Sequence, residues 1–137
     1  MSLDPIMISV TVEADKNKAW EYYTSPNHIT KWNFADPSWH CPSATNALTI
    51  GGRYVARMEA KDGSVGFDFD AVYTDVVIGE RVTYTFGGRH ATITFATVDD
   101  RVEVTVIFDP ETENPIDLQR NGWQAILDNF KRYTETH

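Results

Sequence analysis

The C-terminal segment of the chain carries its one long stretch of helical periodicity. Its apolar residues recur at steps of three and four, which places them on a single helix face. They are Trp123, Ile126, Leu127, Phe130 and Tyr133. Before them, the run Asn114-Pro115-Ile116-Asp117 combines a capping asparagine, a proline suited to the first helical position and an acidic first-turn residue. The sequence therefore predicts a helix to about Glu135, roughly 30 Å long, whose apolar face must be covered.

The middle of the chain predicts five successive strands. Between residues 53 and 108, apolar residues alternate with polar ones, which is typical of strands with one buried face. Turn signals separate these segments at Asp62-Gly63, Gly79-Glu80, Gly87-Gly88 and Asp99-Asp100. Because the connections are short, consecutive strands are expected to pair as an antiparallel meander.

The N-terminal part predicts one more strand and two short helices. Residues 6–12 alternate like a strand, and Asp15 is a good N-cap for a helix carrying Trp20. Ser25-Pro26 then predicts a second helix, which runs to about Trp32. No function is assigned to residues 1–6, which precede a second start-like methionine, Met7, and are expected to be disordered or foreign to the natural chain.

The segment from Asn33 to Thr49 is predicted to be a long loop. Its prolines and serines break any periodicity, yet it carries Trp39, His40 and Cys41. Long loops with their own aromatic residues are often lids or functional sites. We expect this loop to cover the mouth of a pocket, with His40 as its polar group. The alternative is a loop that only packs its rings on the domain.

These elements predict a single α+β domain over residues 1–137, with a curved antiparallel sheet wrapped around the C-terminal helix. A curved sheet around a straight helix is difficult to fill completely, so a cavity is expected between them. The candidate ligand-binding residues share the interior faces and the predicted loop. They are Trp32, Trp39, His40, Tyr54, Met58, Phe67, Phe69, Tyr84, Phe95, Trp123, Leu127 and Phe130. Ordinary core packing is the alternative at each position. Gly122, inside the helix, indicates either a close approach of the sheet or extra pocket volume.

Charge and composition exclude several classes of function. The chain has 20 acidic and 12 basic residues, a formal net charge of -8, and no local cluster of Lys and Arg. Binding to nucleic acid or to an anionic membrane is therefore disfavoured, whereas a small neutral, apolar or cationic ligand remains open. No apolar run approaches the roughly 20 residues of a membrane span, and no signal peptide is recognisable. With Cys41 as the one cysteine, a cytoplasmic location is expected.

Catalytic and metal sites are weakly indicated. Asp36, His40 and Cys41 are residue types of a nucleophilic centre, but neighbours in an extended segment point to opposite sides. No histidine pair has the spacing of a zinc motif, so no metal or cofactor is expected. Strand carboxylates are expected to face solvent, although a β-bulge that reversed the strand would turn them into the pocket together with Arg57. These carboxylates are Glu59, Asp68 and Asp70.

Motifs spread along the chain resemble one known family. They are Trp20, Lys31-Trp32, Gly51-Gly52-Arg53-Tyr54, Gly79-Glu80-Arg81-Val82, Gly122-Trp123 and Phe130-Lys131-Arg132-Tyr133. From about Ile8 to Tyr133, the chain resembles the family related to the activator of the Hsp90 ATPase, within the START/Bet v 1-like helix-grip superfamily. The resemblance implies a helix-grip fold whose cavity serves different members for lipids, polyketides, flavonoid-like rings or hormones. The chaperone-stimulating namesake carries a further N-terminal domain without a counterpart here, so its role is not transferred.

Three functions follow as hypotheses. The first is a non-enzymatic binding protein for a small, largely apolar lipid, polyketide or flavonoid-like ring compound. The second is an enzyme of polyketide cyclase or hydrolase type, which needs a polar group such as His40 inside the cavity. The third is a module that binds a protein partner or a chaperone, which needs an exposed apolar patch outside the pocket.

Overall fold

The computed structural model describes residues 4–137, so part of the prediction for residues 1–6 lies outside the described residues. The elements are β1 (Ile6–Val12), α1 (Lys16–Thr24), α2 (Pro26–Trp32), β2 (Trp39–Asn46), β3 (Arg53–Ala60), β4 (Gly66–Val77), β5 (Arg81–Phe86), β6 (Arg89–Val98), β7 (Arg101–Phe108) and α3 (Ile116–Thr136). All seven strands belong to one sheet, in the order β1-β7-β6-β5-β4-β3-β2.

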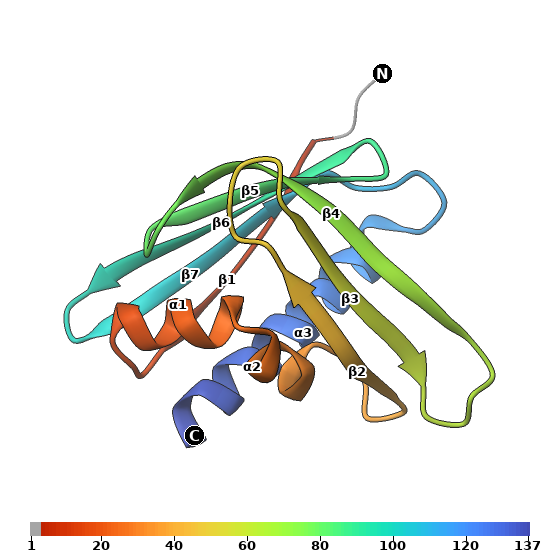
Figure 1. The fold of residues 1–137 in the computed structure, drawn as a ribbon, viewed down its shortest axis with the longest axis horizontal. Helices are drawn as coiled ribbons and strands as arrows, with labels where there is room; N and C mark the ends of the chain where they lie inside the picture. The colour runs from red at the N-terminus through yellow and green to blue at the C-terminus, as the bar shows by residue number, and fades with distance from the viewer. Residues whose placement is uncertain (1–3) are drawn as a thin grey trace.

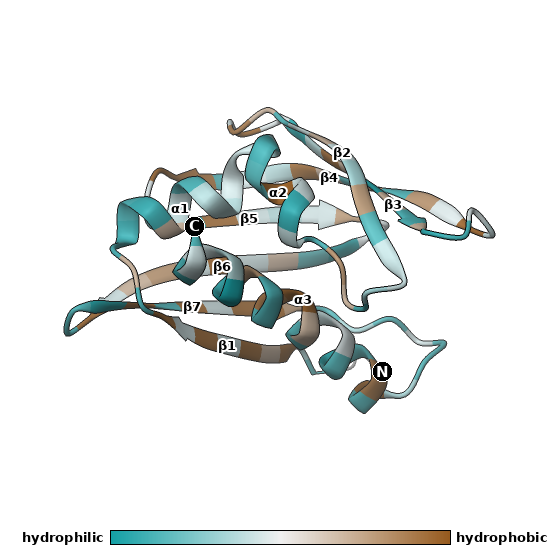
Figure 2. Cartoon of the chain, turned by 90° about the horizontal axis from the view of Figure 1, so that it is seen from below, coloured by the Kyte–Doolittle hydropathy of each residue, from teal (hydrophilic) through white to brown (hydrophobic). Residues whose placement is uncertain are grey.

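The predicted α+β helix-grip architecture is confirmed. The sheet curls, α3 lies on its concave side, and α1 and α2 lie at one end (Figure 1). Seen from below, all three helices lie on the same side of the sheet (Figure 2). Neighbouring strands are antiparallel. The first strand in the chain, β1, pairs with the last, β7, from Ile6 opposite Phe108 to Val12 opposite Val102. The buried residues of these two strands alternate with outward-facing ones, as the sequence predicts.

The prediction of a loop from Asn33 to Thr49 is wrong for residues 39–46, which form the edge strand β2 against β3. The pairing shifts register between His40 and Ser43, where Pro42 interrupts the strand. A proline lacks the N–H that a central strand needs, but it is tolerated at edges and bulges. The bulge also hides the alternation of buried and exposed residues, and this explains why the sequence pattern indicated a loop.

The helix starts need one correction. Asp15 caps α1 as predicted, because its Oδ1 accepts a hydrogen bond from the Lys18 N–H at 2.7 Å. The start of α3 differs, since Pro115 occupies the N-cap position and the Asn114 side chain makes no cap. Instead, the Gln119 side chain holds the preceding loop. Its Oε1 accepts from the Glu111 N–H at 2.8 Å, and its Nε2 donates to the Asn114 carbonyl at 2.8 Å.

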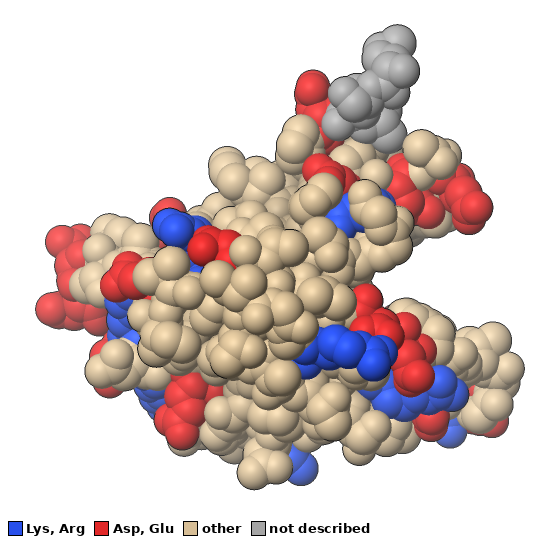
Figure 3. Space-filling model, turned by 45° about the horizontal axis from the view of Figure 1, so that its top comes forward, with Lys and Arg blue, Asp and Glu red and all other residues tan. Residues whose placement is uncertain are grey.

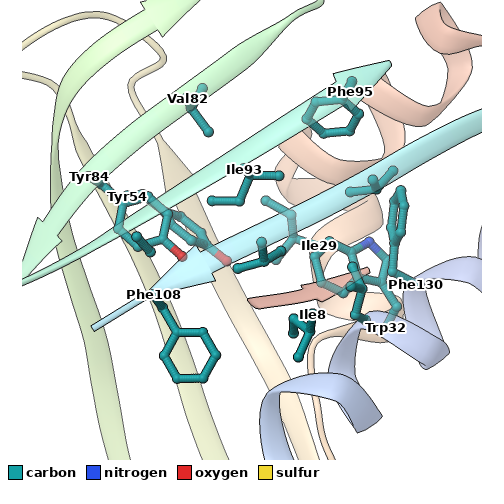
Figure 4. Packing of buried hydrophobic residues seen from close by; sticks show 14 of the residues in the cluster. Ile8, Ile29, Trp32, Tyr54, Val82, Tyr84, Ile93, Phe95, Phe108 and Phe130 are labelled. Atoms are coloured by element: carbon teal, nitrogen blue, oxygen red, sulfur yellow. The ribbon is translucent and has the colours of Figure 1, made fainter. Parts of the chain in front are cut away.

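Two sets of aromatic contacts hold α3 against the rest of the fold. Towards its N-terminal half, Trp123 stacks on Phe108 with ring centroids 4.0 Å apart. About two turns later, Phe130 contacts Tyr23 at 5.0 Å and Trp32 at 5.1 Å, both edge to face. Figure 4 shows Trp32 and Phe130 side by side. Such ring pairs add to the free energy that area burial alone supplies.

Thr134 on α3 provides the first test of this packing. Its side chain is fully buried. Among the buried polar side-chain atoms of residues 4–137, its Oγ1 alone has no hydrogen-bond partner. Thr134→Val removes this unsatisfied hydroxyl at nearly constant volume. We therefore expect the free energy of unfolding, measured by urea denaturation, to rise by about 1 kcal/mol.

Thr24→Val is the matched control for this prediction. Thr24 is also buried, but its hydroxyl donates to the Trp20 carbonyl at 2.8 Å. The same substitution should therefore lower the free energy of unfolding there by about 1 kcal/mol. Equal destabilisation by Thr134→Val and Thr24→Val would show that the Thr134 hydroxyl has a partner after all.

Gly122 provides a second test, in the middle of α3. A Cβ built there meets no atom within 4 Å, so the alternative of a close approach of the sheet is wrong. Gly122→Ala should raise the free energy of unfolding by roughly 0.5 to 1 kcal/mol, because alanine is the better helix former. In contrast, a Cβ on Gly52 would lie 2.0 Å from the Ala47 carbonyl oxygen. Gly52→Ala should therefore lower the melting temperature clearly. A loss of stability in Gly122→Ala would contradict the finding that the space around Gly122 is open.

Candidate ligand cavity

A cavity of about 280 Å3 lies between the concave face of the sheet and α3. Side chains from β3, β4 and β5 line one wall, and Trp123, Ile126 and Leu127 of α3 line the other. Eight of the twelve candidate residues are in this lining: Trp32, Tyr54, Met58, Phe67, Phe69, Tyr84, Trp123 and Leu127. The structure therefore brings together residues from α2, three strands and α3 around one space.

The other two interior candidates, Phe95 and Phe130, lie behind the cavity wall. They are 2% and 0% exposed and belong to the packed core near α1 and α2. Phe95 packs edge to face against Trp20 at 5.3 Å and Tyr23 at 5.5 Å. Both rings support lining residues without lining the cavity themselves.

Trp39 and His40 lie on the edge strand β2 and are also outside the lining. The Trp39 ring packs edge to face against Phe67 with centroids 6.1 Å apart. The His40 side chain is 42% exposed, and its Nε2 lies 3.7 Å from Glu59 Oε1. The predicted lid is therefore wrong, because these residues belong to the sheet.

The mouth of the cavity arises where β4 extends beyond β5. The pairing of β4 with β5 begins at Val72 opposite Thr85, so residues 66–71 of β4 pair with β3 alone. The gap between this half of β4 and the β5–β6 turn holds a second, shallower hollow of about 300 Å3. The hollow shares Phe67, Phe69 and Arg89 with the cavity. Figure 3 shows the molecule deeply notched beside the projecting β3–β4 hairpin. Access from solvent therefore runs through the split in the sheet.

Three tyrosines, Tyr23, Tyr54 and Tyr84, supply hydroxyl groups to the lining, which also includes the polar side chains of Asn33 and Arg89. Tyr54 and Tyr84 lie side by side, with ring centroids 6.0 Å apart and both hydroxyls pointing to the interior (Figure 4). Asn33 Nδ2 donates to the Tyr54 hydroxyl at 3.4 Å, which leaves the hydroxyl proton free to be donated.

Burial raises the pKa of each of these three tyrosines well above its usual value near 10, because the phenolate would lose its hydration. Burial likewise raises the pKa of the neighbouring Tyr73 to about 12. The Tyr73 hydroxyl donates to Asn46 Oδ1 at 2.7 Å. The lining tyrosines are therefore neutral hydrogen-bond donors at physiological pH.

The strand carboxylates face outward, as the sequence predicts, and the alternative in which a bulge turns them inward is wrong. On the outer face, Asp70 pairs with Arg53, and Asp68 lies 3.4 Å from Arg57. Arg57 also contacts Glu59 at 2.8 Å. These exposed pairs contribute little to stability, but they balance the charge of the carboxylates beside the mouth.

No hydrogen bond joins the side chains of Asp36, His40 and Cys41, the residues considered for nucleophilic chemistry. Cys41 is buried and its thiol donates to the Ser43 carbonyl at 3.5 Å; burial raises the pKa of this thiol. Asp36 accepts from the Ser38 N–H at 2.8 Å, which lowers the pKa of its carboxyl. Within residues 4–137, no three His, Cys, Asp or Glu side chains are placed to hold a metal ion. Over the same residues, no helix has the length and apolar character to cross a membrane.

Comparison with known proteins gives the family. Residues 13–135 match the model of the family described as "Activator of Hsp90 ATPase homolog 1-like protein". The chain belongs to this family. An AHSA1-like protein from Aeromonas hydrophila has a similar solution structure, with 37% identity, a TM-score of 0.88, and coverage of 96% of this chain and 93% of that one. A protein from Cytophaga hutchinsonii is 47% identical with a TM-score of 0.84, covering 96% and 92%.

More distant structures share the fold of this chain. A protein from Chromobacterium violaceum has a TM-score of 0.85 at 20% identity, over 97% of this chain and 99% of that one. No curated protein matches the chain.

Six residues in the lining of the cavity were not among the sequence candidates: Ile8, Tyr23, Asn33, Arg89, Val106 and Ile126. Four of them lie on faces that the sequence pattern already marks as interior, so alternation and helical spacing were sufficient signals for them. Asn33 and Arg89 had no such signal. Asn33 follows the end of α2, and Arg89 follows a Gly-Gly turn, where a polar residue is usually solvated.

The raised tyrosine pKa values predict how stability depends on pH. Unfolded tyrosines ionise near pH 10, whereas the buried ones stay protonated. A raised pKa in the folded state stabilises the fold fully below the unfolded pKa, and this contribution is lost as pH rises above it. The free energy of unfolding, measured by urea denaturation from about pH 8 to about pH 11, should therefore fall above about pH 10.

Variants identify the tyrosines responsible. Tyr54→Phe and Tyr84→Phe should each make the fall shallower, by at most about 1.4 kcal/mol per pH unit. Phe86→Leu is the control, because it alters a neighbouring ring without a titratable group and should shift stability equally at every pH. A wild-type slope in both tyrosine variants would contradict the assignment.

Proposed function

We propose that this protein binds a small, largely apolar ligand in the cavity between the sheet and α3. The cavity itself supports the proposal, because about 280 Å3 lined mainly by rings is far more than a packed core leaves empty. An unfilled apolar cavity lowers the stability of a fold. A ligand that occupies the cavity therefore offsets this loss of stability. The volume lies just below the range of typical ligand pockets, which span roughly 300 to 1,000 Å3. The expected ligand is therefore compact, with one or two rings or a short chain.

The polar groups in the lining support an orienting role. The neutral hydroxyls of Tyr54 and Tyr84 lie together on one wall, and Asn33 occupies one acceptor position of Tyr54. Donors in a water-poor wall bind acceptors such as a carbonyl or ether oxygen with good selectivity, because leaving them unpaired is costly. A lipid, polyketide or flavonoid-like ring compound offers such oxygens on an apolar body.

Binding is favoured over the two alternative functions. The enzyme hypothesis relied on His40 or a strand carboxylate inside the cavity, and the side chains of His40, Asp68 and Asp70 are 42%, 59% and 45% exposed. The family name refers to a chaperone activator, but a partner-binding role does not account for an internal cavity lined by rings. A small ligand accounts for the rings, the donors and the mouth together.

The test is direct binding of an uncharged fluorescent ring compound, N-phenyl-1-naphthylamine, whose emission rises in apolar surroundings. We expect saturable binding to the wild-type protein. Ile126→Trp should lower the affinity at least tenfold, about 1.4 kcal/mol, because the added indole fills the cavity from α3.

Leu118→Trp is the matched control on the same helix. Leu118 is 59% exposed and is not part of the lining, so this variant should bind the probe like the wild type. Absence of saturable binding, or equal loss in both tryptophan variants while both remain folded by circular dichroism, would refute a ligand site in this cavity.

A further inference from the structure

Arg89 at the start of β6 is the one Lys or Arg in the described chain that lines the cavity. Its guanidinium lies over the face of Phe86, with Cζ 4.5 Å from the ring centroid. Phe86 in turn contacts Phe69 at 5.2 Å and Trp123 at 5.7 Å, and both of these rings line the cavity. Stacking on Phe86 therefore places a positive charge at the boundary between the cavity and the hollow outside it.

This guanidinium has no carboxylate partner within residues 4–137. Its one hydrogen bond there is from Nη1 to the Asp109 carbonyl oxygen, at 3.3 Å. The Asp109 carboxylate is bound elsewhere, since its Oδ2 accepts from the His90 N–H at 2.9 Å and lies 3.1 Å from His90 Nδ1. By comparison, Arg53, Arg57, Arg81, Arg101 and Arg120 each pair with a carboxylate. An arginine has five N–H donors, so most of those on Arg89 are free at the mouth.

We propose that the ligand is an amphipathic acid, whose carboxylate binds Arg89 at the mouth while its apolar body fills the cavity. The proposal rests on the function above and names the class of ligand. A guanidinium matches a carboxylate because two parallel N–H donors meet its two oxygens. A second acceptor on the body of the ligand would meet the hydroxyls of Tyr54 and Tyr84 deeper inside.

Negative charge near the mouth does not exclude an anion. Asp68 and Asp70 border the outer hollow, but each is paired with an arginine of β3. The overall charge of -8 is spread over the surface, and charges beyond roughly 8 Å are screened at physiological ionic strength. If Asp68 and Asp70 dominated instead, the site would prefer a cation, and the experiment includes this outcome.

The experiment compares three probes of one shape: 2-naphthoate, uncharged 2-naphthamide and cationic 2-naphthylmethylammonium. Their affinities are measured by titration calorimetry and by displacement of N-phenyl-1-naphthylamine. We expect the acid to bind wild-type protein about tenfold more tightly than the amide, as is typical of a charge-assisted hydrogen bond. Arg89→Gln should remove this preference and leave the affinity of the amide within about twofold.

Two further variants separate charge at the mouth from structure and from net charge. Arg89→Lys keeps the charge and should retain part of the preference for the acid. Arg101→Gln changes the net charge by the same amount. Arg101 starts β7, lines neither the cavity nor the outer hollow, and pairs with Glu13. This variant should therefore bind the three probes like the wild-type protein.

The outcomes distinguish this inference from the proposed function. One outcome is that N-phenyl-1-naphthylamine binds but 2-naphthoate and 2-naphthamide bind equally, and another is that the cation binds best. Either outcome refutes an amphipathic acid as the ligand, while the cavity remains a ligand site. If Arg89→Gln lowers the affinity of acid and amide alike, Arg89 only supports the packing of Phe86 and the inference is wrong. If no probe binds, both proposals are refuted together.

Discussion

The spacing between two ring contacts on α3 determines the interior of this protein. Trp123 stacks on Phe108 at 4.0 Å towards the N-terminal half of the helix, and Phe130 is held by Tyr23 and Trp32 about two turns later. A helix fixed at two points by large rings cannot settle further onto the sheet between them. Ile126 and Leu127 lie in that interval, and both face the cavity. The open space is thus a consequence of how the helix is supported.

The strand lengths determine where this space meets solvent. β4 has 12 residues, whereas its neighbour β5 has 6 and turns back at Gly87-Gly88. The unmatched half of β4 leaves the sheet open beside the cavity, and Phe67, which is 52% exposed, lies at this opening. A continuous sheet would have sealed the interior. The turn that ends β5 also places Arg89 at this opening. The same turn therefore accounts for both the opening to solvent and the positive charge beside it.

Much of this fold could be predicted from residue patterns because each pattern reports a physical period. Helical spacing identified the inward face of α3, and alternation identified the inward faces of five strands in the meander. The edge strand was missed because Pro42 and the register shift interrupt its period. Alternation also tells which side of a sheet a residue faces but not how deeply it lies. Phe95 and Phe130 therefore could not be separated from the lining residues by pattern alone.

Polar residues at the ends of elements were the least predictable part of the site. Arg89 next to a glycine turn and Asn33 after a helix both have the local context of solvated residues. Their place in the cavity depends on contacts between distant segments, such as Asn33 with Tyr54 and the Arg89 guanidinium with Phe86. In an interior built from rings, these groups and the tyrosine hydroxyls are the polar contacts that the cavity offers to the proposed ligand. In the proposed function, the apolar walls limit the size of the ligand, and the polar groups at the two ends of the cavity bind its oxygens.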